Sequence, residues 1–564
     1  MDRTDKLALI KKYRLIPEIL LCALFFSLIY FQSGFWFETN DDHIICDILS
    51  GLVSGKPEMH TVNASILVSA PMAILYSIST SISWWGLFLL LLSFGGVLLL
   101  LDAVIGKVQS YWGLFASIVL FFSIALTTWY MRARVQYTTI AMLLAFSGYA
   151  AVALYEKKTK YIIFFLCQIA AYATRPQSME IMQPIGLCLL SGIVCLHKED
   201  FKNKVKEVLV TLTLAVLVIA IGLVSYKVAY KGYQWERTAD FHEYRAQMFD
   251  YSGITPYEQI DGLSDEDISK EEYDAFSELM IFDYDRILDT VIKAAETSKN
   301  NYQKPSTIET AKWVLTGSYS NNTNRWIIAV LFVAFAGLAL YRRKLLCSVL
   351  FLLAYVIGKG VSWGYLYQSG RMPYRVMFPL YFAEELVLGI GIVLLITSKE
   401  TEARKIGKSV KAAVVALFCV TIAFLGIRAG RNWSRILSLD NNSYPILSRM
   451  EMQIADYCEK ESNNRYIVSS RFYANYKRRV MEASLSGGNY VYSGGWFSCI
   501  PSAREHMEEY LETGEVYYIT PVNEAEADSD KALLYLKLYY RYEPTLEDAF
   551  MLDTGGEAFV YRVR

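Results

Sequence analysis

Apolar residues in this chain occur in long uninterrupted blocks, and these blocks constrain the fold more than any other feature. Each block is long enough for a helix to cross much of the roughly 30 Å hydrocarbon core of a bilayer. Backbone amides inside hydrocarbon must be hydrogen-bonded internally, so such blocks must be helices. With 54% hydrophobic and only 20% charged residues, the 564-residue chain resembles neither a disordered chain nor a typical soluble enzyme. The sequence therefore predicts a mainly α fold, a polytopic membrane helical bundle.

About 11 transmembrane helices are predicted, and the basic residues between them set the orientation. If the N-terminus lies inside, the inside loops contain the basic clusters at 11–14, 157–160, 198–206 and 399–411, whereas the opposite short loops contain few basic residues. We therefore expect a multi-pass protein of the plasma (cytoplasmic) membrane, with a cytoplasmic N-terminus and an extracytoplasmic C-terminal segment. The predicted spans lie at 15–33, 84–105, 112–130, 136–155, 161–174, 180–196, 207–229, 326–340, 344–362, 376–397 and 410–428.

The apolar stretch 62–80 is open to two interpretations. If it crossed the membrane, every later basic loop would change sides and violate the positive-inside rule. Because Pro71 interrupts the stretch and Ser is frequent in it, we interpret it as one or two helices at the outer membrane surface. An ordinary span with a weak charge bias is the alternative.

Two long segments are polar and are predicted to be external, the loop 230–325 and the tail 431–564. The tail contains short β-branched and aromatic runs at 466–470, 516–520 and 558–563, separated by helical patterns. We therefore predict a transmembrane domain over 1–430, which includes the first external loop 34–83 and the loop 230–325. A small external α/β domain follows over 431–564.

Charge and motif content exclude several functions. Lys and Arg number 55 against 56 Asp and Glu, so the chain offers no overall attraction for nucleic acid. The sequence contains no Walker-type loop, no GxSxG elbow and no dinucleotide fingerprint. ATP-driven transport is therefore disfavoured.

The adjacent acids Asp41 and Asp42, directly after the first predicted span, are the strongest candidate for catalysis. Neighbouring carboxylates at a low-dielectric boundary repel each other, which favours a raised pKa and general base catalysis on a hydroxyl. The alternative is that both are solvated loop residues, with Asn40 or Asp41 as the N-cap of a helix that begins near His43.

Further polar residues gather at the same predicted side of the membrane. A guanidinium group binds phosphate oxygens through two parallel hydrogen bonds, so arginines at these loops suit an anionic lipid donor. They equally suit interfacial anchors that extend to lipid headgroups. The predicted substrate-binding residues are Glu38, His43, Arg132, Arg134, Gln136, Arg175, Gln177, Arg371, Tyr374 and Arg375.

Glu384 and Glu385 fall inside a predicted span. A carboxylate at that depth is costly, and it either lines a cavity or finds a cation. We favour a structural ion pair inside the bundle.

The order of these features resembles the GT-C glycosyltransferases, which include protein O-mannosyltransferases and lipid A aminoarabinose transferases. The resemblance is carried by Asp41-Asp42 after the first span, by the predicted helix end at Ser54-Gly55, and by the stretch from Lys56-Pro57 through Asn63. It implies transfer of a sugar, with inversion, from a polyprenyl-phosphate donor to a cell-envelope glycan or lipid acceptor. By this resemblance Asp41 is the catalytic base and Asp42 its acidic neighbour.

One departure from the GT-C pattern concerns metal binding. The second external loop of such enzymes often contributes another acid, whereas this chain has Arg134-Val135-Gln136 there. Two carboxylates from separate loops are the usual site for a hard cation. We therefore expect no cofactor and no metal site, with Asp41 and Asp42 alone forming only a weak ligand set for Mg²⁺ or Mn²⁺.

Two other functions remain open from the sequence. A transporter or flippase of lipid-linked glycan would place charged residues near the bilayer midplane and show two related halves. A polysaccharide polymerase or ligase would share the substrate class and the external site, but would use arginine and histidine in place of Asp41. All three functions imply the lipid bilayer as a partner.

Overall fold

The structure is a computed structural model. It describes residues 13–106, 134–196, 201–397 and 442–564, apart from gaps at 261, 264–267, 278–283, 303, 318–322, 343–344, 462, 484–487 and 513, together with the isolated residues 407, 409 and 416. The described part is mostly helical, as predicted. The chain separates into two compact units. The bundle unit comprises residues 1–35, 88–223 and 305–438, and the α/β unit comprises 36–87, 224–304 and 439–564.

Eight described helices are long and apolar enough to cross a membrane, which supports the prediction of a multi-pass protein. Two further apolar helices, α4 (Ile66–Ile78) and α9 (Thr159–Thr174), are shorter. The predicted span 112–130 lies outside the described residues, as does 410–428 apart from residue 416, so the total of 11 spans is not confirmed. The eight helices are α2 (Leu15–Ser33), α5 (Trp84–Gly106), α8 (Tyr137–Leu154), α10 (Pro176–Leu196), α11 (Phe201–Ala229), α16 (Thr323–Tyr341), α17 (Leu345–Gln368) and α18 (Tyr374–Thr397).

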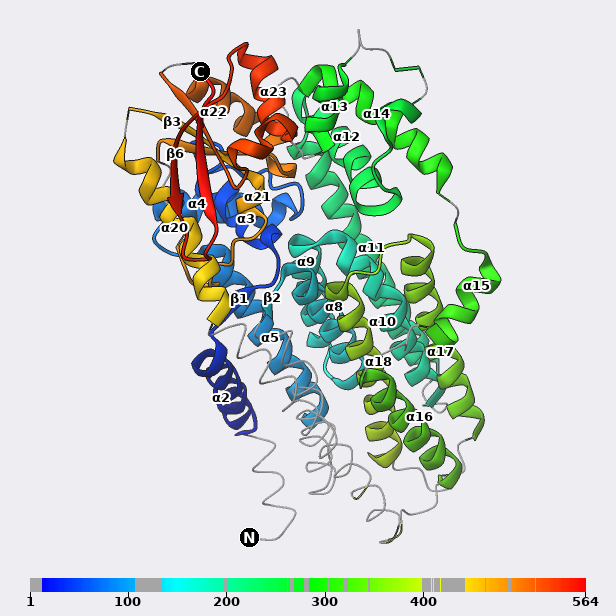
Figure 1. The fold of residues 1–564 in the computed structure, drawn as a ribbon. Coiled ribbons are helices and arrows are strands. Elements are labelled where there is room, and N and C mark those ends of the chain that lie inside the picture. The colour runs from blue at the N-terminus through cyan, green and yellow to red at the C-terminus, as the bar shows by residue number, and fades with distance from the viewer. Residues whose placement is uncertain are drawn as a thin grey trace. The chain divides into compact units, whose positions relative to one another are not determined.

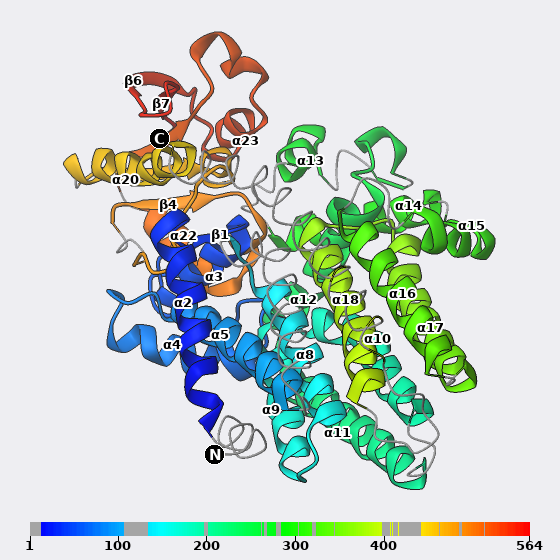
Figure 2. The ribbon, with the colours of Figure 1, turned by 90° about the horizontal axis from the view of Figure 1, so that it is seen from below.

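The bundle unit is built around α8, whose residues are all buried. This helix packs against α9, α10 and α18, while α10 also packs against α17 and α16 against α18 (Figure 1). Figure 2 shows α16, α17 and α18 side by side. A helix that is apolar on every face is typical of such an enclosed position. The short helix α15 (Thr307–Lys312) belongs to the same unit.

A proline in α18 creates a specific contact between α18 and α8. Pro379 lies inside α18 and has no N–H, so the carbonyl of Arg375 loses its helical donor. The hydroxyl of Thr139, in the first turn of α8, donates to that carbonyl at 3.0 Å. Side-chain hydroxyls from a neighbouring helix are one way in which bundles satisfy such freed groups.

We predict that Thr139→Val lowers the free energy of unfolding by about 1 kcal/mol, because it removes the hydroxyl that donates to the half-buried carbonyl of Arg375. Thr213→Val is the control, since Thr213 is exposed on α11 and its hydroxyl bonds only the carbonyl of Leu209 in its own helix. Thermal unfolding of the purified protein in detergent measures both. Equal effects of the two substitutions would contradict this account.

The α/β unit contains one five-stranded sheet in the order β4-β3-β5-β7-β6. β3 pairs in parallel with β4 and β5, and β7 pairs antiparallel with β5 and β6. The strands predicted at 466–470, 516–520 and 558–563 are therefore confirmed as β3, β5 and β7. The strands are β3 (Arg465–Ser469), β4 (Tyr490–Ser493), β5 (Val516–Thr520), β6 (Thr545–Met551) and β7 (Glu557–Arg562).

Helices cover both faces of this sheet, because successive side chains of a strand point to opposite faces. Tyr466 and Val468 of β3 join a core formed with α20 (Tyr444–Lys460) and with α3 (Asn40–Ser50). Ile467 joins a second core, formed with α22 (Pro501–Leu511) and α23 (Lys531–Tyr540). A helix from the first 50 residues of the chain is thus part of the layer that covers the C-terminal sheet.

Three further helices of this unit come from the segment 224–304. α12 (Tyr233–Ala246), α13 (Lys270–Ser277) and α14 (Tyr284–Asn301) contribute to a third core, which also includes Cys499. The segment 224–304 and α3 thus belong to the same compact unit as the tail. The sequence analysis predicted both as parts of the transmembrane domain 1–430. The predicted boundary at 430/431 stays a prediction.

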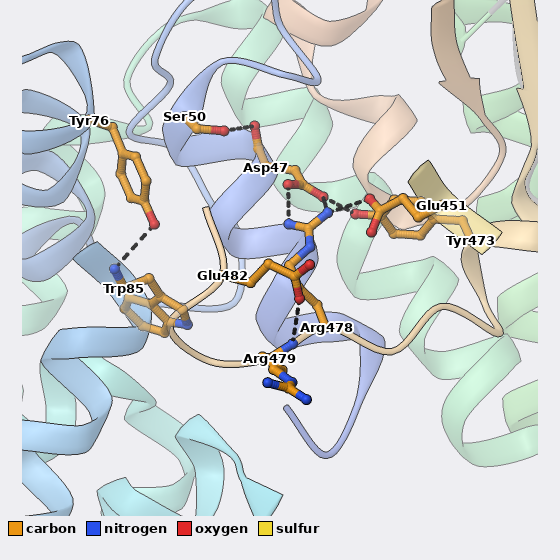
Figure 3. Close-up of polar contacts among 9 residues, drawn as sticks. All are labelled: Asp47, Ser50, Tyr76, Trp85, Glu451, Tyr473, Arg478, Arg479 and Glu482. Atoms are coloured by element: carbon orange, nitrogen blue, oxygen red, sulfur yellow. Dashed lines mark hydrogen bonds and ion pairs between the residues drawn. The ribbon is translucent and has the colours of Figure 1, made fainter. Parts of the chain in front are cut away.

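The stretch 62–80 forms a single short helix, α4 (Ile66–Ile78), capped by Ser65 and containing Pro71. Its 13 residues extend about 20 Å, which is less than the bilayer core. The hydroxyl of Tyr76 accepts a hydrogen bond from the backbone N–H of Trp85 at 3.2 Å and so links α4 to the start of α5 (Figure 3). These features fit the interpretation of 62–80 as a surface helix.

Candidate functional site

The acid pair lies on the first turn of α3, just after the first candidate span. The N-cap is Thr39, in an extended conformation, so Asp41 and Asp42 occupy the positions where negative charge is favoured by the helix dipole. Successive helical residues point about 100° apart. Asp41 is half-buried, whereas Asp42 is completely buried. The two carboxylates therefore face different surroundings.

Two details of the sequence interpretation are corrected by α3. The helix begins at Asn40 with Thr39 as its cap, not near His43, because Thr39 is the last residue with extended backbone angles. It ends at Ser50, not at Ser54-Gly55, because Gly51 adopts φ +90°. A Cβ at Gly51 would lie 2.5 Å from the backbone carbon of Lys56, so the chain can turn here only with glycine.

His43 follows the acid pair and points into the unit. Its side chain is 1% exposed and its ring packs edge-on against Tyr473 at 5.0 Å. Burial lowers the pKa of His43 well below its usual range, and the charges of Arg478 and Lys477 lower it further. The imidazole is therefore neutral at physiological pH.

A buried ionic cluster holds the second half of α3, and we call it the Arg478 clamp (Figure 3). Arg478 donates to Asp47 through Nη1 at 2.6 Å and through Nη2 at 3.2 Å, and it also donates to Glu451 of α20. The hydroxyl of Tyr473 donates to the same Asp47 carboxylate at 2.5 Å. Arg478, Asp47 and Glu451 are all at least 95% buried. The clamp thus joins α3, α20 and the 471–482 segment.

The clamp contains two acids for one guanidinium, and this imbalance affects Glu451. Burial raises the pKa of Glu451 to about 7, the charge of Asp47 raises it further, and Arg478 opposes both effects. The pKa of Tyr473 lies well above its usual range for the same reasons, burial first and then the Asp47 charge. Asp47 therefore faces groups that all act as donors, and Glu451 is the clamp acid that takes up a proton near neutral pH.

We predict that Arg478→Met lowers the free energy of unfolding by about 3–5 kcal/mol, because it leaves buried acids without their cation. Arg449→Met is the control. Arg449 on α20 pairs with Asp553 at 2.6 Å, but both are exposed, so that loss is expected to stay below about 1 kcal/mol. Unfolding monitored by circular dichroism compares the two. Similar losses would show that the buried pairing adds nothing.

A second prediction concerns pH and Glu451. A carboxyl whose pKa is higher in the folded state binds its proton more tightly there, so its stabilising contribution is complete below pH 4.5 and disappears as the pH rises through about 7. We expect Glu451→Gln to remove this decline, which amounts to no more than about 3 kcal/mol. Chemical denaturation of both proteins at pH 5, 6, 7 and 8 measures it. Parallel pH curves would contradict the assignment.

The bundle unit brings together residues from three of the predicted polar loops. Gln136 is the N-cap of α8, and its side chain accepts from the N–H of Thr139 at 3.0 Å. The guanidinium of Arg175 lies over the ring of Tyr137, 5.3 Å from its centroid. Arg375 meets Thr139 through the carbonyl described above. The first turns of α8, α10 and α18 therefore converge.

The other predicted substrate-binding residues occupy varied positions. Arg134, in the short strand β2 (Arg134–Val135), is 1% exposed, and Gln136 is fully buried. Arg175, Arg371 and Arg375 are half-buried, while Gln177 and Tyr374 are exposed. Glu38, just after the strand β1 (Trp36–Phe37), is half-buried. Arg132 lies outside the described residues.

Within the part of the chain that the structure describes, no group of three His, Cys, Asp or Glu side chains is placed to hold a metal ion. The weak two-carboxylate ligand set expected of Asp41 and Asp42 stays a prediction.

Sequence reasoning missed the Arg478 clamp entirely. Asp47 and Arg478 are 431 residues apart, and neither lies in a recognisable motif. The one local signal was an acid among the apolar residues of α3, because an unpaired carboxylate is rarely found on a buried helix face. Neither a protein-family model nor a curated protein matches this sequence at a significant level.

Proposed function

We propose that the protein is a membrane glycosyltransferase of the GT-C type. It would move a sugar from a polyprenyl-phosphate donor to a cell-envelope glycan or lipid acceptor on the extracytoplasmic face. The observation that carries this proposal is the acid pair on the first turn of α3. This helix begins at Asn40, seven residues after the first candidate span ends at Ser33. The multi-pass bundle fits a lipid-linked donor that arrives through the bilayer.

Asp41 is the proposed general base, because it is the half-buried member of the pair and Asp42 is enclosed. Its carboxylate removes the proton from the acceptor hydroxyl as that oxygen attacks the anomeric carbon of the donor. The bond from this carbon to the lipid phosphate breaks, and the configuration inverts. The negative charge that develops on the departing phosphate requires a cation or hydrogen-bond donors, a role that suits the guanidinium group of an arginine.

The location and orientation follow from the sequence and complete the proposal. The positive-inside rule favours a cytoplasmic N-terminus, a plasma-membrane location and an extracytoplasmic tail. In that orientation the α/β unit, which contains α3, lies on the acceptor side and binds the acceptor.

We predict that Asp41→Asn reduces sugar transfer by about 10²- to 10⁴-fold, because the amide cannot take the proton from the acceptor hydroxyl. The assay is transfer in proteoliposomes from a panel of polyprenyl-phosphate sugars to envelope glycan and lipid acceptors. Glu271→Gln, at an exposed acid of α13 in the same unit, is the control and keeps full activity. A parallel arm with EDTA tests whether a divalent metal is needed.

Two outcomes would count against this mechanism. Full transfer by Asp41→Asn, with a melting temperature equal to that of the wild type, would exclude Asp41 as the base and favour the arginine-centred polymerase or ligase. Transfer that stops with EDTA and returns with Mg²⁺ or Mn²⁺ would require a metal in the reaction.

A transporter of lipid-linked glycan is a second candidate, and one observation favours it. Lys359 and Glu384 form an ion pair at 3.1 Å, both at least 95% buried, near the middle of α17 and α18. Charged groups near the bilayer midplane are typical of transporters. Movement of labelled lipid across proteoliposomes, without any sugar transfer, would favour this candidate.

A further inference from the structure

The interior of the bundle unit contains a carboxylate that is fully provided with hydrogen-bond donors. Glu384, ten residues into α18, accepts from the Lys359 ammonium at 3.1 Å and from the hydroxyl of Tyr355 through the same oxygen. Its other oxygen accepts from the indole N–H of Trp363 at 2.6 Å. The three donors follow one another at four-residue intervals along α17, and so share one face of that helix. This confirms the ion pair expected at Glu384.

The neighbouring Glu385 has different surroundings. Its side chain is completely buried, and neither carboxylate oxygen has a hydrogen-bond partner among the described residues. Glu384 and Lys359 already neutralise each other, so Lys359 leaves no charge to balance a second carboxylate. An ionised carboxylate without a partner in such a place costs several kcal/mol, and the usual response is to bind a proton.

We propose that Glu385 is a proton-binding site inside the bundle, next to the fixed and neutral Lys359–Glu384 pair. The ligand is a proton, which exchanges with water when the bundle opens. The site does not depend on the glycosyltransferase proposal, because it lies in a different unit from Asp41.

The groups around Glu385 support an exchangeable proton. Among the described residues, Glu384 is the charged group that acts on Glu385, and Tyr355 of α17 is the titratable neighbour from another helix. Glu384 is paired with the Lys359 ammonium, and its carboxylate disfavours a second negative charge beside it. Any movement that separated α17 from α18 would weaken the pair and change the proton affinity of Glu385. The proton is thereby linked to the packing of these two helices.

Infrared spectroscopy of the full-length protein in lipid vesicles tests this directly. At pH 8 exposed carboxyl groups are ionised, so the C=O stretch of a protonated carboxylic acid reports buried acids alone. The spectrum of the wild type minus that of Glu385→Gln is expected to contain this band, and the band is expected to shift in D₂O because the proton exchanges. Absence of the band from the difference spectrum would overturn the proposal.

The melting temperatures of two variants compare the adjacent acids Glu384 and Glu385. Because Gln is a neutral replacement for a protonated Glu, Glu385→Gln is expected to change the melting temperature by less than about 2 °C. Glu384→Gln removes the counter-ion of Lys359 and is expected to lower it by roughly 5–10 °C. The double variant Glu384→Gln with Lys359→Met should recover part of that loss. Equal effects of the two single substitutions would overturn the assignment.

A third measurement needs no variant. A hydrophobic carbodiimide adds the O–H of a protonated carboxylic acid across one C=N bond, and an acyl shift to nitrogen then gives a stable N-acylurea without a leaving group. Mass spectrometry of labelled wild-type protein is expected to locate the adduct on Glu385. An adduct on Glu384, or on neither residue, would contradict the proposal.

Discussion

The pairing of Arg478 with Asp47 and Glu451 is the interaction on which the α/β unit depends, because it places one guanidinium between elements that are far apart in sequence. Burial of two carboxylates in an aromatic core is tolerated only when a cation and donors accompany them. The clamp therefore does more than hold α3: Tyr473, which donates to Asp47, also packs against His43. The contacts of Asp47 with Arg478 and Tyr473, one to two turns further along α3, thus fix the position of the first turn and its acid pair.

The bundle unit also contains more buried acids than cations at one place. In each unit one cation is buried with two acids, Arg478 with Asp47 and Glu451, and Lys359 with Glu384 and Glu385. One acid of each set receives several hydrogen-bond donors, Asp47 in the α/β unit and Glu384 in the bundle unit. The other acid is the one assigned to proton binding: burial raises the pKa of Glu451 to about 7, and Glu385 has no hydrogen-bond partner among the described residues. Both units therefore contain a group whose charge responds to its environment.

The sequence predicted the helices and strands, which depend on local hydrophobic periodicity. It did not predict ion pairs between residues that are far apart in the chain. Long apolar blocks gave the positions of helices such as α8 and α18, and alternating runs gave the strands β3, β5 and β7. Helix ends were less accurate, because the turn at Gly51 and the glycine four residues later look alike in sequence. Nothing local to Asp47 or Arg478 indicates a partner more than 400 residues away. The sequence placed the loops that contain Arg175 and Gln136 on the same side of the membrane. It did not predict that Arg175 lies over the ring of Tyr137.

The two ends of α3 contain the proposed catalytic acid and a structural acid. Asp41 lies on the first turn and is half-buried, while Asp47 lies about 9 Å further along the helix axis and is enclosed. A base must meet solvent or substrate, so it cannot also be the group that satisfies a buried guanidinium. Placing the two carboxylates on one rigid helix lets the buried one fix the direction of the accessible one. In the proposed mechanism the reacting acid is Asp41, and Asp47, which no sequence motif highlights, holds the helix in place.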